Sequence, residues 1–267
     1  MKEEHKQKIG LALGSGGLRG LAHIGVIKVL LENKIPIDFI SGSSAGSLVG
    51  SYFSVFGEVD SLEKYILENS SEFLPMLFDF SLSGGFVSGK KIDLFLEKIL
   101  NGSDFSQTKI PFYVIATDLI SGEPVYYSTG RISPAVRGSM SVPLVFKPVS
   151  YQDKLLVDGG LSEPVPVEIL KKIGADKVIA INLYHKNEFD KKEFTISNVA
   201  LRTTIIALHN LAKTSVRNAD LVLNPDVSIC VRDIKLTNYF NIENIKKIIA
   251  IGEEEARSHL SEIKKLL

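Results

Sequence analysis

The stretch that decides the fold is IGLALGSGGLRG at residues 9–20. Its first five residues predict a short buried strand, the glycines predict a loop, and apolar residues then recur at helical spacing up to Glu32. The same order follows at once: Ile37–Ile40 is predicted as a second strand, stopped by the sequence GSSAG of residues 42–46, and Ala45–Phe56 as a helix. Two successive strand–loop–helix units predict an α/β protein.

Apolar or β-branched runs continue to alternate with helical stretches along the chain. Further strands are predicted at Phe112–Ala116, Leu155–Val157, Lys177–Leu183 and Leu221–Leu223, and helices at Val165–Lys172 and Asn244–Leu267. This alternation favours a mostly parallel, buried sheet. We expect one domain over residues 1–267, with a charged tail at 1–8, a motif-bearing part at 9–173, and C-terminal strands and helices at 174–267.

Composition excludes several classes of function. Lys plus Arg total 31 and Asp plus Glu total 31, so the chain lacks the positive charge that nucleic-acid binding relies on. The single cysteine, Cys230, cannot form an internal disulfide, which fits a reducing compartment. The charged N-terminus and the short apolar stretch after it fit neither a secretory signal nor a spanning helix. We therefore expect a cytoplasmic protein whose contact with a membrane, if any, is peripheral.

Residues 42–46 match the G-x-S-x-G elbow, in which a serine lies on a tight turn between a strand and a helix. Gly42 and Gly46 fit this turn because a side chain at either position would crowd it. The five-residue pattern is common, but a predicted strand before it and a predicted helix after it favour Ser44 as a nucleophile. A serine hydroxyl needs a base to accept its proton.

Histidine is the usual base, yet none is well placed. His185, His209 and His259 follow the serine, but none lies in a turn that would bring an imidazole to the end of a strand, so surface or helix-packing roles are expected. His23 precedes the serine, one helical turn after Arg19, and a helix-face or capping role is expected for it.

An aspartate is better placed. Asp158 follows the apolar run Leu155–Val157 and precedes Gly159 and Gly160, which puts a carboxylate where a strand gives way to a loop. Binding sites collect at that edge of a parallel sheet. Capping of a turn remains the alternative for Asp158, and also for Asp118, which lacks the glycine pair.

The third feature is the glycine loop at residues 14–20, which leads into a predicted helix. Unencumbered N–H groups and the helix dipole favour an anion there, either a phosphate or the oxyanion formed when a serine attacks an ester. A dinucleotide site is the competing interpretation, but Arg19 occupies the last glycine position of G-x-G-x-x-G. The acidic residue expected at the end of the second strand is also missing, because Asp38 begins that strand.

Taken together, SGGLRG at 15–20, GSSAG at 42–46 and DGG at 158–160 resemble the three signatures of the patatin-like phospholipases, in the same order. The segment AVRGSMSVP at 135–143 resembles the helix and loop that precede the family's aspartate, so the likeness spans roughly Ile9 to Ile173. The resemblance implies a three-layer α/β/α fold of the bacterial, single-domain type. It also implies a lipid acyl hydrolase that uses a Ser44–Asp158 dyad, an acyl-enzyme, and neither a cofactor nor a metal ion.

The resemblance also assigns the oxyanion hole to Gly16, Gly17, Leu18 and Arg19. The residues expected to support the motifs are Gly14, Ser15, Gly20, Gly42, Gly46, Gly159 and Gly160. Ser15 departs from the family pattern, which often has glycine there, and would be strained if the position required a positive φ. A lipid or another acyl ester is the expected substrate; the alternative is a catalytically unused regulatory or lipid-binding protein.

One apolar cluster remains open to two interpretations. Between Ser70 and Val87, apolar side chains lie among glycines and serines without helical order: Phe73, Leu74, Met76, Leu77, Phe78, Phe80 and Phe86. They form either part of the core or an acyl-chain entrance that touches a membrane as a lid.

Overall fold

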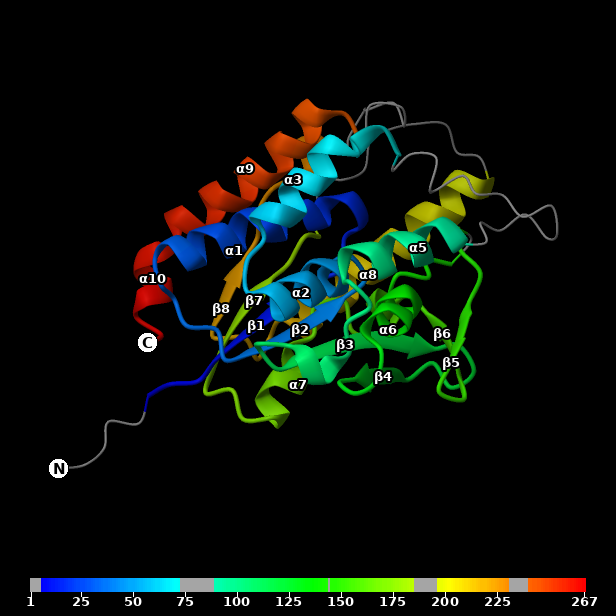
Figure 1. Ribbon diagram of the computed structural model, residues 1–267, viewed down its shortest axis with the longest axis horizontal. Helices are drawn as coiled ribbons and strands as arrows, with labels where there is room; N and C mark the ends of the chain where they lie inside the picture. Colours follow the sequence, from blue (N-terminus) through cyan, green and yellow to red (C-terminus); the bar gives the residue numbers. More distant parts are fainter. Residues whose placement is uncertain (1–5, 73–88, 144, 185–195, 231–239) are drawn as a thin grey trace.

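The structure is a computed structural model that describes residues 6–72, 89–143, 145–184, 196–230 and 240–267. The apolar cluster Phe73–Phe86 and His185 lie outside these residues, so the predictions made for them stay predictions. The described chain folds around one mixed sheet with helices on both of its faces (Figure 1).

The sheet has the strand order β5-β6-β3-β2-β1-β7-β8, with β4 paired to β3. The strands are β1 (Ile9–Leu13), β2 (Phe39–Ser43), β3 (Phe112–Asp118), β4 (Pro124–Tyr127), β5 (Val149–Tyr151), β6 (Lys154–Val157), β7 (Lys177–Ile181) and β8 (Leu221–Leu223). The five strands β3, β2, β1, β7 and β8 are joined by parallel pairings, and the antiparallel pairings of the described chain are β3 with β4, β3 with β6 and β5 with β6. The predicted, mostly parallel sheet is confirmed.

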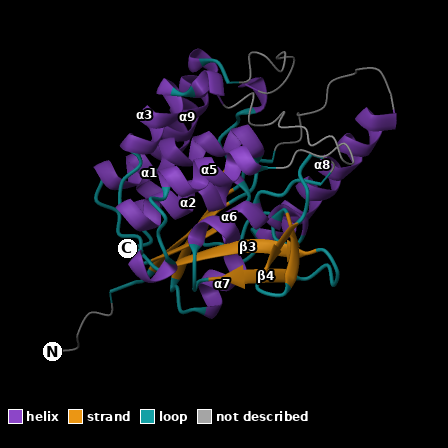
Figure 2. Ribbon diagram, turned by 45° about the vertical axis from the view of Figure 1, so that its right-hand side comes forward, coloured by secondary structure: helices purple, strands orange, loops and turns teal. Residues whose placement is uncertain are grey.

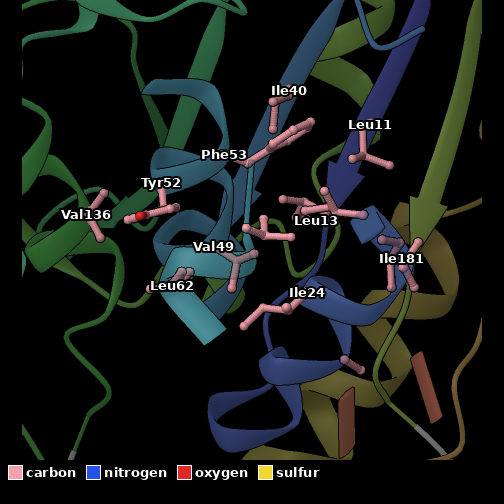
Figure 3. Close-up of a cluster of buried hydrophobic side chains, with 14 of the residues drawn as sticks. Leu11, Leu13, Ile24, Ile40, Val49, Tyr52, Phe53, Leu62, Val136 and Ile181 are labelled. Carbon is pink, nitrogen blue, oxygen red and sulfur yellow. The ribbon is translucent and has the colours of Figure 1, made fainter. Parts of the chain in front are cut away.

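Alternation along the strands divides the core between the two faces of the sheet, because successive side chains of a strand point to opposite sides. On β1, Leu11 and Leu13 pack in one cluster and Ala12 in the other. The larger cluster includes Ile24, Val49 and Phe53, which lie beside Leu11 and Leu13 in Figure 3. These strand residues are fully buried, as expected for a sheet covered on both faces.

The helices accordingly form two layers, and Figure 2 shows one helix of the second layer, α7, below β3 and β4. One layer contains α1 (Ala22–Glu32), α2 (Ala45–Phe56), α3 (Asp60–Glu68), α5 (Lys90–Ile99), α6 (Ile132–Ser139), α9 (Ile242–Ser258) and α10 (Leu260–Lys264). The other contains α7 (Val167–Lys172) and α8 (Ile196–Ser215). This is the predicted three-layer arrangement. Among the described helices, none is both long enough and apolar enough to span a bilayer.

The last long helix, α9, lies along α1 (Figure 1). Two glycines allow the close crossing: a Cβ at Gly25 would lie 2.0 Å from the carbonyl oxygen of Ile249, and one at Gly252 would lie 2.1 Å from that of Ala22. Neither distance is possible for a real side chain, so glycine is required on both helices. The C-terminal part of the chain is thereby packed directly against the helix that follows the glycine loop.

The boundaries of some predicted elements differ in the structure. β2 begins at Phe39, not Ile37, and continues through Gly42 and Ser43, because these residues pair with Leu13 and Ile115 of the neighbouring strands. The helix predicted to run from Asn244 to the C-terminus is interrupted at His259, which ends α9 and precedes α10. The short strands β4 and β5 were not predicted.

Candidate active site

Ser44 occupies the turn between β2, which ends at Ser43, and α2, which begins at Ala45. Its φ of 52° and ψ of −120° are strained for a residue that carries a side chain. The carbonyl of Ser44 accepts hydrogen bonds from Ser47, at 2.9 Å from the amide and 2.6 Å from the hydroxyl. Ser44 is only 5% exposed, so the turn holds its hydroxyl inside the protein.

Gly46 brings this turn close to the glycine loop. A Cβ at position 46 would lie 2.1 Å from the carbonyl oxygen of Leu13 and 2.8 Å from that of Gly14. Because any side chain would collide with this backbone, only glycine lets the first turn of α2 lie against the end of β1. The two motifs separated in the sequence therefore meet at the carboxyl ends of neighbouring strands.

Asp158 follows β6 and faces Ser44. The Ser44 hydroxyl donates to Oδ2 of Asp158 at 2.6 Å, and the amide of Gly160 donates to Oδ1 at 2.8 Å. The backbone of Asp158 is held as well, because its amide donates to the carbonyl of Ser141 at 3.0 Å and its carbonyl accepts from the hydroxyl of Thr117 at 2.8 Å. Both carboxylate oxygens thus have a donor, and one of these donors is the serine hydroxyl.

Burial governs the charge of this carboxyl group. Removal from water raises the pKa of Asp158 to about 6, against the opposing effects of the hydrogen bonds from Ser44 and Gly160, which stabilise the charged form. At neutral pH most molecules therefore carry an Asp158 carboxylate, with a pKa closer to neutrality than that of an exposed aspartate. A carboxylate in this condition can accept a proton from the hydroxyl that it contacts.

The glycine loop lies on the β1 side of Ser44. Its first residues are held by the backbone, with the amide of Gly14 donating to the carbonyl of Ile181 at 3.1 Å and that of Ser15 to the carbonyl of Pro164 at 2.7 Å. Ser15 is not among the described non-glycine residues with positive φ, and its hydroxyl hydrogen-bonds to that of Tyr184 at 2.8 Å. The serine at this position is therefore accommodated without backbone strain.

The backbone amides around the start of the 3₁₀ helix η1 (Gly17–Leu21) differ in their hydrogen bonds. Those of Gly16, Gly17 and Leu18 donate no hydrogen bond to any other described residue. The amide of Arg19 differs, since it donates to the carbonyl of Gly16 at 3.2 Å, and the Arg19 Nε does so at 3.0 Å. Gly17 has a φ of +57°, and a Cβ there would meet no atom within 4 Å.

The remaining glycines bring the three motifs together. A Cβ at Gly160 would lie 2.8 Å from the hydroxyl oxygen of Ser15 and 2.9 Å from Asp158 Oδ1, and one at Gly20 would lie 2.4 Å from the Cβ of Ala45. The glycine loop therefore borders both the Asp158 turn and the start of α2. The other motif glycines are Gly42 in β2 and Gly159 in η3 (Gly159–Leu161), which also lie against backbone.

His23 holds the glycine loop through a hydrogen bond to Gly14. It is completely buried in α1, and its Nε2 lies 2.7 Å from the carbonyl oxygen of Gly14, which can only accept, so Nε2 carries the proton. Burial lowers the pKa of His23 to about 4, which keeps the ring neutral at neutral pH. A neutral side chain of α1 therefore fixes the backbone of the glycine loop at Gly14.

The model of the family described as patatin-like phospholipase matches residues 11–171, more than half of the chain's 267 residues. The chain belongs to this family. The segment matched contains the glycine loop, Ser44 and Asp158, so the resemblance drawn from the three motifs is confirmed.

Patatin-like relatives agree over the same part of the chain. An uncharacterized NTE family protein of Mycobacterium tuberculosis is 36% identical over 177 residues, which cover 66% of this chain and 49% of the relative. Lysophospholipase nte1 of Aspergillus fumigatus is 30% identical over 180 residues, which cover 66% of this chain and 12% of the relative. The chain thus matches about half or less of the length of these relatives. The crystal structure of VipD from Legionella pneumophila shares the fold, with a TM-score of 0.62 at 15% identity, covering 96% of this chain and 67% of that one.

Among the hydrogen bonds of Ser44 and Asp158 in the described part of this patatin-like chain, none involves a histidine. His209 lies on α8 and His259 at the end of α9, where its Nδ1 is 3.0 Å from the carbonyl oxygen of Glu255. The carboxylate of Asp118 accepts from the Ser121 hydroxyl at 3.0 Å and pairs with Lys154 at 3.0 Å, which fits the turn-capping alternative. Within the described ranges, no group of three or more His, Cys, Asp or Glu side chains could hold a metal ion.

Sequence reasoning missed the polar residues that hold the patatin-like site from outside its motifs. Ser139, Ser141 and Thr117 hydrogen-bond to the backbone of Ser44 or Asp158, and His23 holds Gly14. Ser139 and Ser141 lie in the segment 135–143, which resembles the family, but the sequence did not indicate what these two serines do. For His23 the signal was a polar residue among the apolar residues of the first turns of α1, before Ile27.

Proposed function

We propose that the chain is a serine hydrolase of lipid acyl esters in which Ser44 is the nucleophile and Asp158 the general base. The observation that carries this proposal is the direct hydrogen bond of 2.6 Å from the Ser44 hydroxyl to the Asp158 carboxylate. Family membership and the lysophospholipase among the relatives support a lipid ester as the substrate. The pKa of about 6 supports Asp158 as a base at neutral pH.

In the first half of the reaction, Ser44 Oγ attacks the ester carbonyl while its proton passes to Asp158. The carbonyl electrons move to the oxygen, which becomes an oxyanion. The amides of Gly16, Gly17 and Leu18 are the proposed donors to it, and one such donor is worth about 3 kcal/mol of transition-state stabilisation. Collapse of this intermediate expels the alcohol, which takes the proton from Asp158, and leaves an acyl group on Ser44.

In the second half, water attacks the acyl-enzyme and gives its proton to Asp158. Collapse of the second intermediate releases the fatty acid, and the proton returns to Ser44. No histidine is needed, because one carboxylate accepts and returns the proton in both halves. The amide of Arg19 is not included among the donors, because it is directed to the Gly16 carbonyl.

The test is the variant Ser44→Ala, compared with Ser54→Ala as a matched control. Ser54 is also a buried serine of α2, but its hydroxyl donates to the carbonyl of Ser51 within the helix. Ser44→Ala should lower ester hydrolysis by about 10³-fold or more and abolish labelling by a fluorophosphonate, whereas Ser54→Ala should keep both. Hydrolysis retained by Ser44→Ala would overturn the assignment.

A substrate panel defines the lipid class. Phospholipids, lysophospholipids, neutral lipids and short p-nitrophenyl esters should be compared with the wild-type protein and with Ser44→Ala as the blank. We expect lysophospholipids to be hydrolysed. A wild-type protein that neither hydrolyses any ester nor reacts with the fluorophosphonate would favour the regulatory, lipid-binding alternative.

A further inference from the structure

The end of α6 touches both members of the proposed dyad. Ser139, the last residue of α6, is completely buried, and its hydroxyl accepts a hydrogen bond from the amide of Ser44 at 2.8 Å. The same hydroxyl donates to the carbonyl of Ile115 in β3 at 2.5 Å. A single side chain thus ties the backbone of the strained turn to the neighbouring strand.

This hydrogen bond bears on the conformation of Ser44. A non-glycine residue at φ 52° and ψ −120° persists only where the surroundings hold it. The hydroxyl of Ser139 is the partner of the Ser44 amide, which lies between the last pairing of β2 and the first helical bonds of α2. Without the hydroxyl, a buried N–H loses its acceptor and the turn loses a point of attachment.

The residues after α6 hold the backbone of Asp158, here through a main-chain carbonyl. The carbonyl of Ser141 accepts from the amide of Asp158 at 3.0 Å. Ser141 is itself fixed, because its hydroxyl accepts from Nη1 of Arg137 at 2.7 Å and donates to the Arg137 carbonyl at 2.9 Å. Arg137 is only 3% exposed and lies 3.2 Å, by its Nε, from the carboxylate of Asp93.

We propose that Ser139 is a positioning residue that sets the backbone of Ser44 so that its hydroxyl meets Asp158, and that the end of α6 thereby aligns both groups. The inference rests on the proposed function, because it assigns Ser139 to the same reaction. Ser139 does not touch the reacting atoms. Its effect reaches the chemistry through the backbone of Ser44.

The test compares Ser139→Ala with Ser133→Ala and Ser139→Thr. Ser133 is a buried serine in the first turn of the same helix, and its hydroxyl hydrogen-bonds to Glu97 instead of the dyad. Ser139→Ala should lower kcat by about 10- to 100-fold with KM changed less than about twofold, because small misplacements of reacting groups have effects of this size. Labelling by the fluorophosphonate should slow by the same factor. Ser133→Ala should keep kcat, and Ser139→Thr should restore at least part of it, because threonine keeps the hydroxyl.

The pH profile separates positioning from general loss of structure. The hydrogen bond from Ser44 lowers the pKa of Asp158, so a displaced serine should move the acidic limb of kcat/KM to higher pH in Ser139→Ala. Ser133→Ala should leave that limb unchanged. An equal loss of kcat in the two variants, with both acidic limbs unmoved, would assign the effect to packing of α6 and overturn the inference.

Hydrogen exchange tests the geometry without using activity. In the wild-type protein the Ser44 amide should be protected, and Ser139→Ala should speed its exchange while α1 keeps its own protection. Unchanged exchange at Ser44 overturns the inference even if Ser44→Ala is inactive. Conversely, if Ser44→Ala keeps full hydrolysis, the proposed function fails. Faster exchange of the Ser44 amide in Ser139→Ala would then show that Ser139 holds the turn but has no part in the reaction. The two failures are therefore distinguishable.

Discussion

The two sides of the candidate active site are built by opposite means. On the β1 side, the glycine loop offers backbone amides, and it is held by hydrogen bonds to backbone carbonyls, to His23 and, through the Ser15 hydroxyl, to Tyr184. On the β3 and β6 side, hydroxyl groups of Ser139 and Thr117 hold the backbones of Ser44 and Asp158. In the proposed reaction, rigid amides suit the oxyanion, whereas side chains from other elements help to hold the turns that carry the proposed nucleophile and base.

Each side also contains a fully desolvated titratable group that holds or belongs to the site, His23 on one and Asp158 on the other, and burial favours the neutral form of both. It lowers the pKa of His23 to about 4 and raises that of Asp158 to about 6. At neutral pH His23 is already neutral, but Asp158 is charged. Burial of His23 therefore costs no charge desolvation at neutral pH. Burial of the Asp158 carboxylate does, and this carboxylate is the base of the proposed reaction.

The largest expected effect comes from neutralising the aspartate. Asp158→Asn keeps the shape of the side chain but cannot accept a proton, so hydrolysis should fall by about 10³-fold or more. The same variant should be more stable at pH 8, by up to about 3 kcal/mol, because the pKa rise from 3.8 to about 6 reflects a penalty on the buried carboxylate that the amide avoids. Urea unfolding at pH 8 and initial hydrolysis rates measure the two effects. A variant that is both inactive and less stable at pH 8 would contradict this account of the aspartate.

A second prediction concerns stability at acidic pH. The folded-state pKa of His23 is depressed, so its contribution is present above about pH 6.5 and is lost as the pH falls to about 4, by up to about 3 kcal/mol. Asp158 acts in the opposite direction, because its penalty disappears as it is protonated below about pH 6. The two changes should largely cancel in the wild-type protein between pH 6.5 and pH 4.

Single variants should separate these contributions. Asp158→Asn should show a steeper loss of stability below pH 6.5 than the wild-type protein, because of these two buried groups only His23 then titrates. His23→Gln, whose amide can still donate to the Gly14 carbonyl, should gain stability relative to its own value at neutral pH as Asp158 is protonated. Urea unfolding at pH 7.5 and pH 4.5 measures both slopes. Parallel pH curves for the two variants would show that these groups do not control the pH dependence.

The smallest expected effect on stability is at Gly17. Gly17→Ala places a side chain at a φ of +57° without any clash, so it should cost about 1 kcal/mol of stability. Gly122 is a matched control, since its φ is +77° and a Cβ there also meets open space. Because Gly17→Ala keeps the backbone amide, it should lower kcat by at most about tenfold, through displacement of that amide at the strained φ, whereas Gly122→Ala should lose only stability. Thermal unfolding and kcat measure this pair, and a loss of stability at Gly17 well above that at Gly122 would contradict the open space around both positions.

Much of the fold was predictable because its signals are local. Continuous apolar runs marked β1, β3 and β7, and the glycine loop and the elbow marked the turns that follow β1 and β2. The extension of β2 through Gly42 and Ser43 was missed because these residues have little intrinsic preference for strands. Pairing with both neighbouring strands imposes the conformation, and such pairing is visible only once the chain is folded.

The site was predictable in its motifs and not in its supports. Ser44 and Asp158 belong to short patterns, and the 2.6 Å hydrogen bond between them agrees with the pair that the resemblance implied. Ser139 contacts Ser44 across 95 residues of sequence, and nothing local marks one serine among many as a hydrogen-bond acceptor for a distant amide. The burial of His23 likewise depends on the packing of α9 and the sheet around α1, and the spacing of residues along the sequence does not predict this packing.

The close crossing of α1 and α9 has a consequence for dissection of the protein. The family model ends at residue 171, yet the glycine-paired helix begins at Ile242, and β7, whose Ile181 carbonyl binds the Gly14 amide, also lies beyond that end. A fragment cut at the matched boundary would retain every signature motif while exposing the apolar surface of α1 and an unpaired edge of β1. Such a fragment would be prone to aggregate, although by its motifs alone it would be recognised as complete.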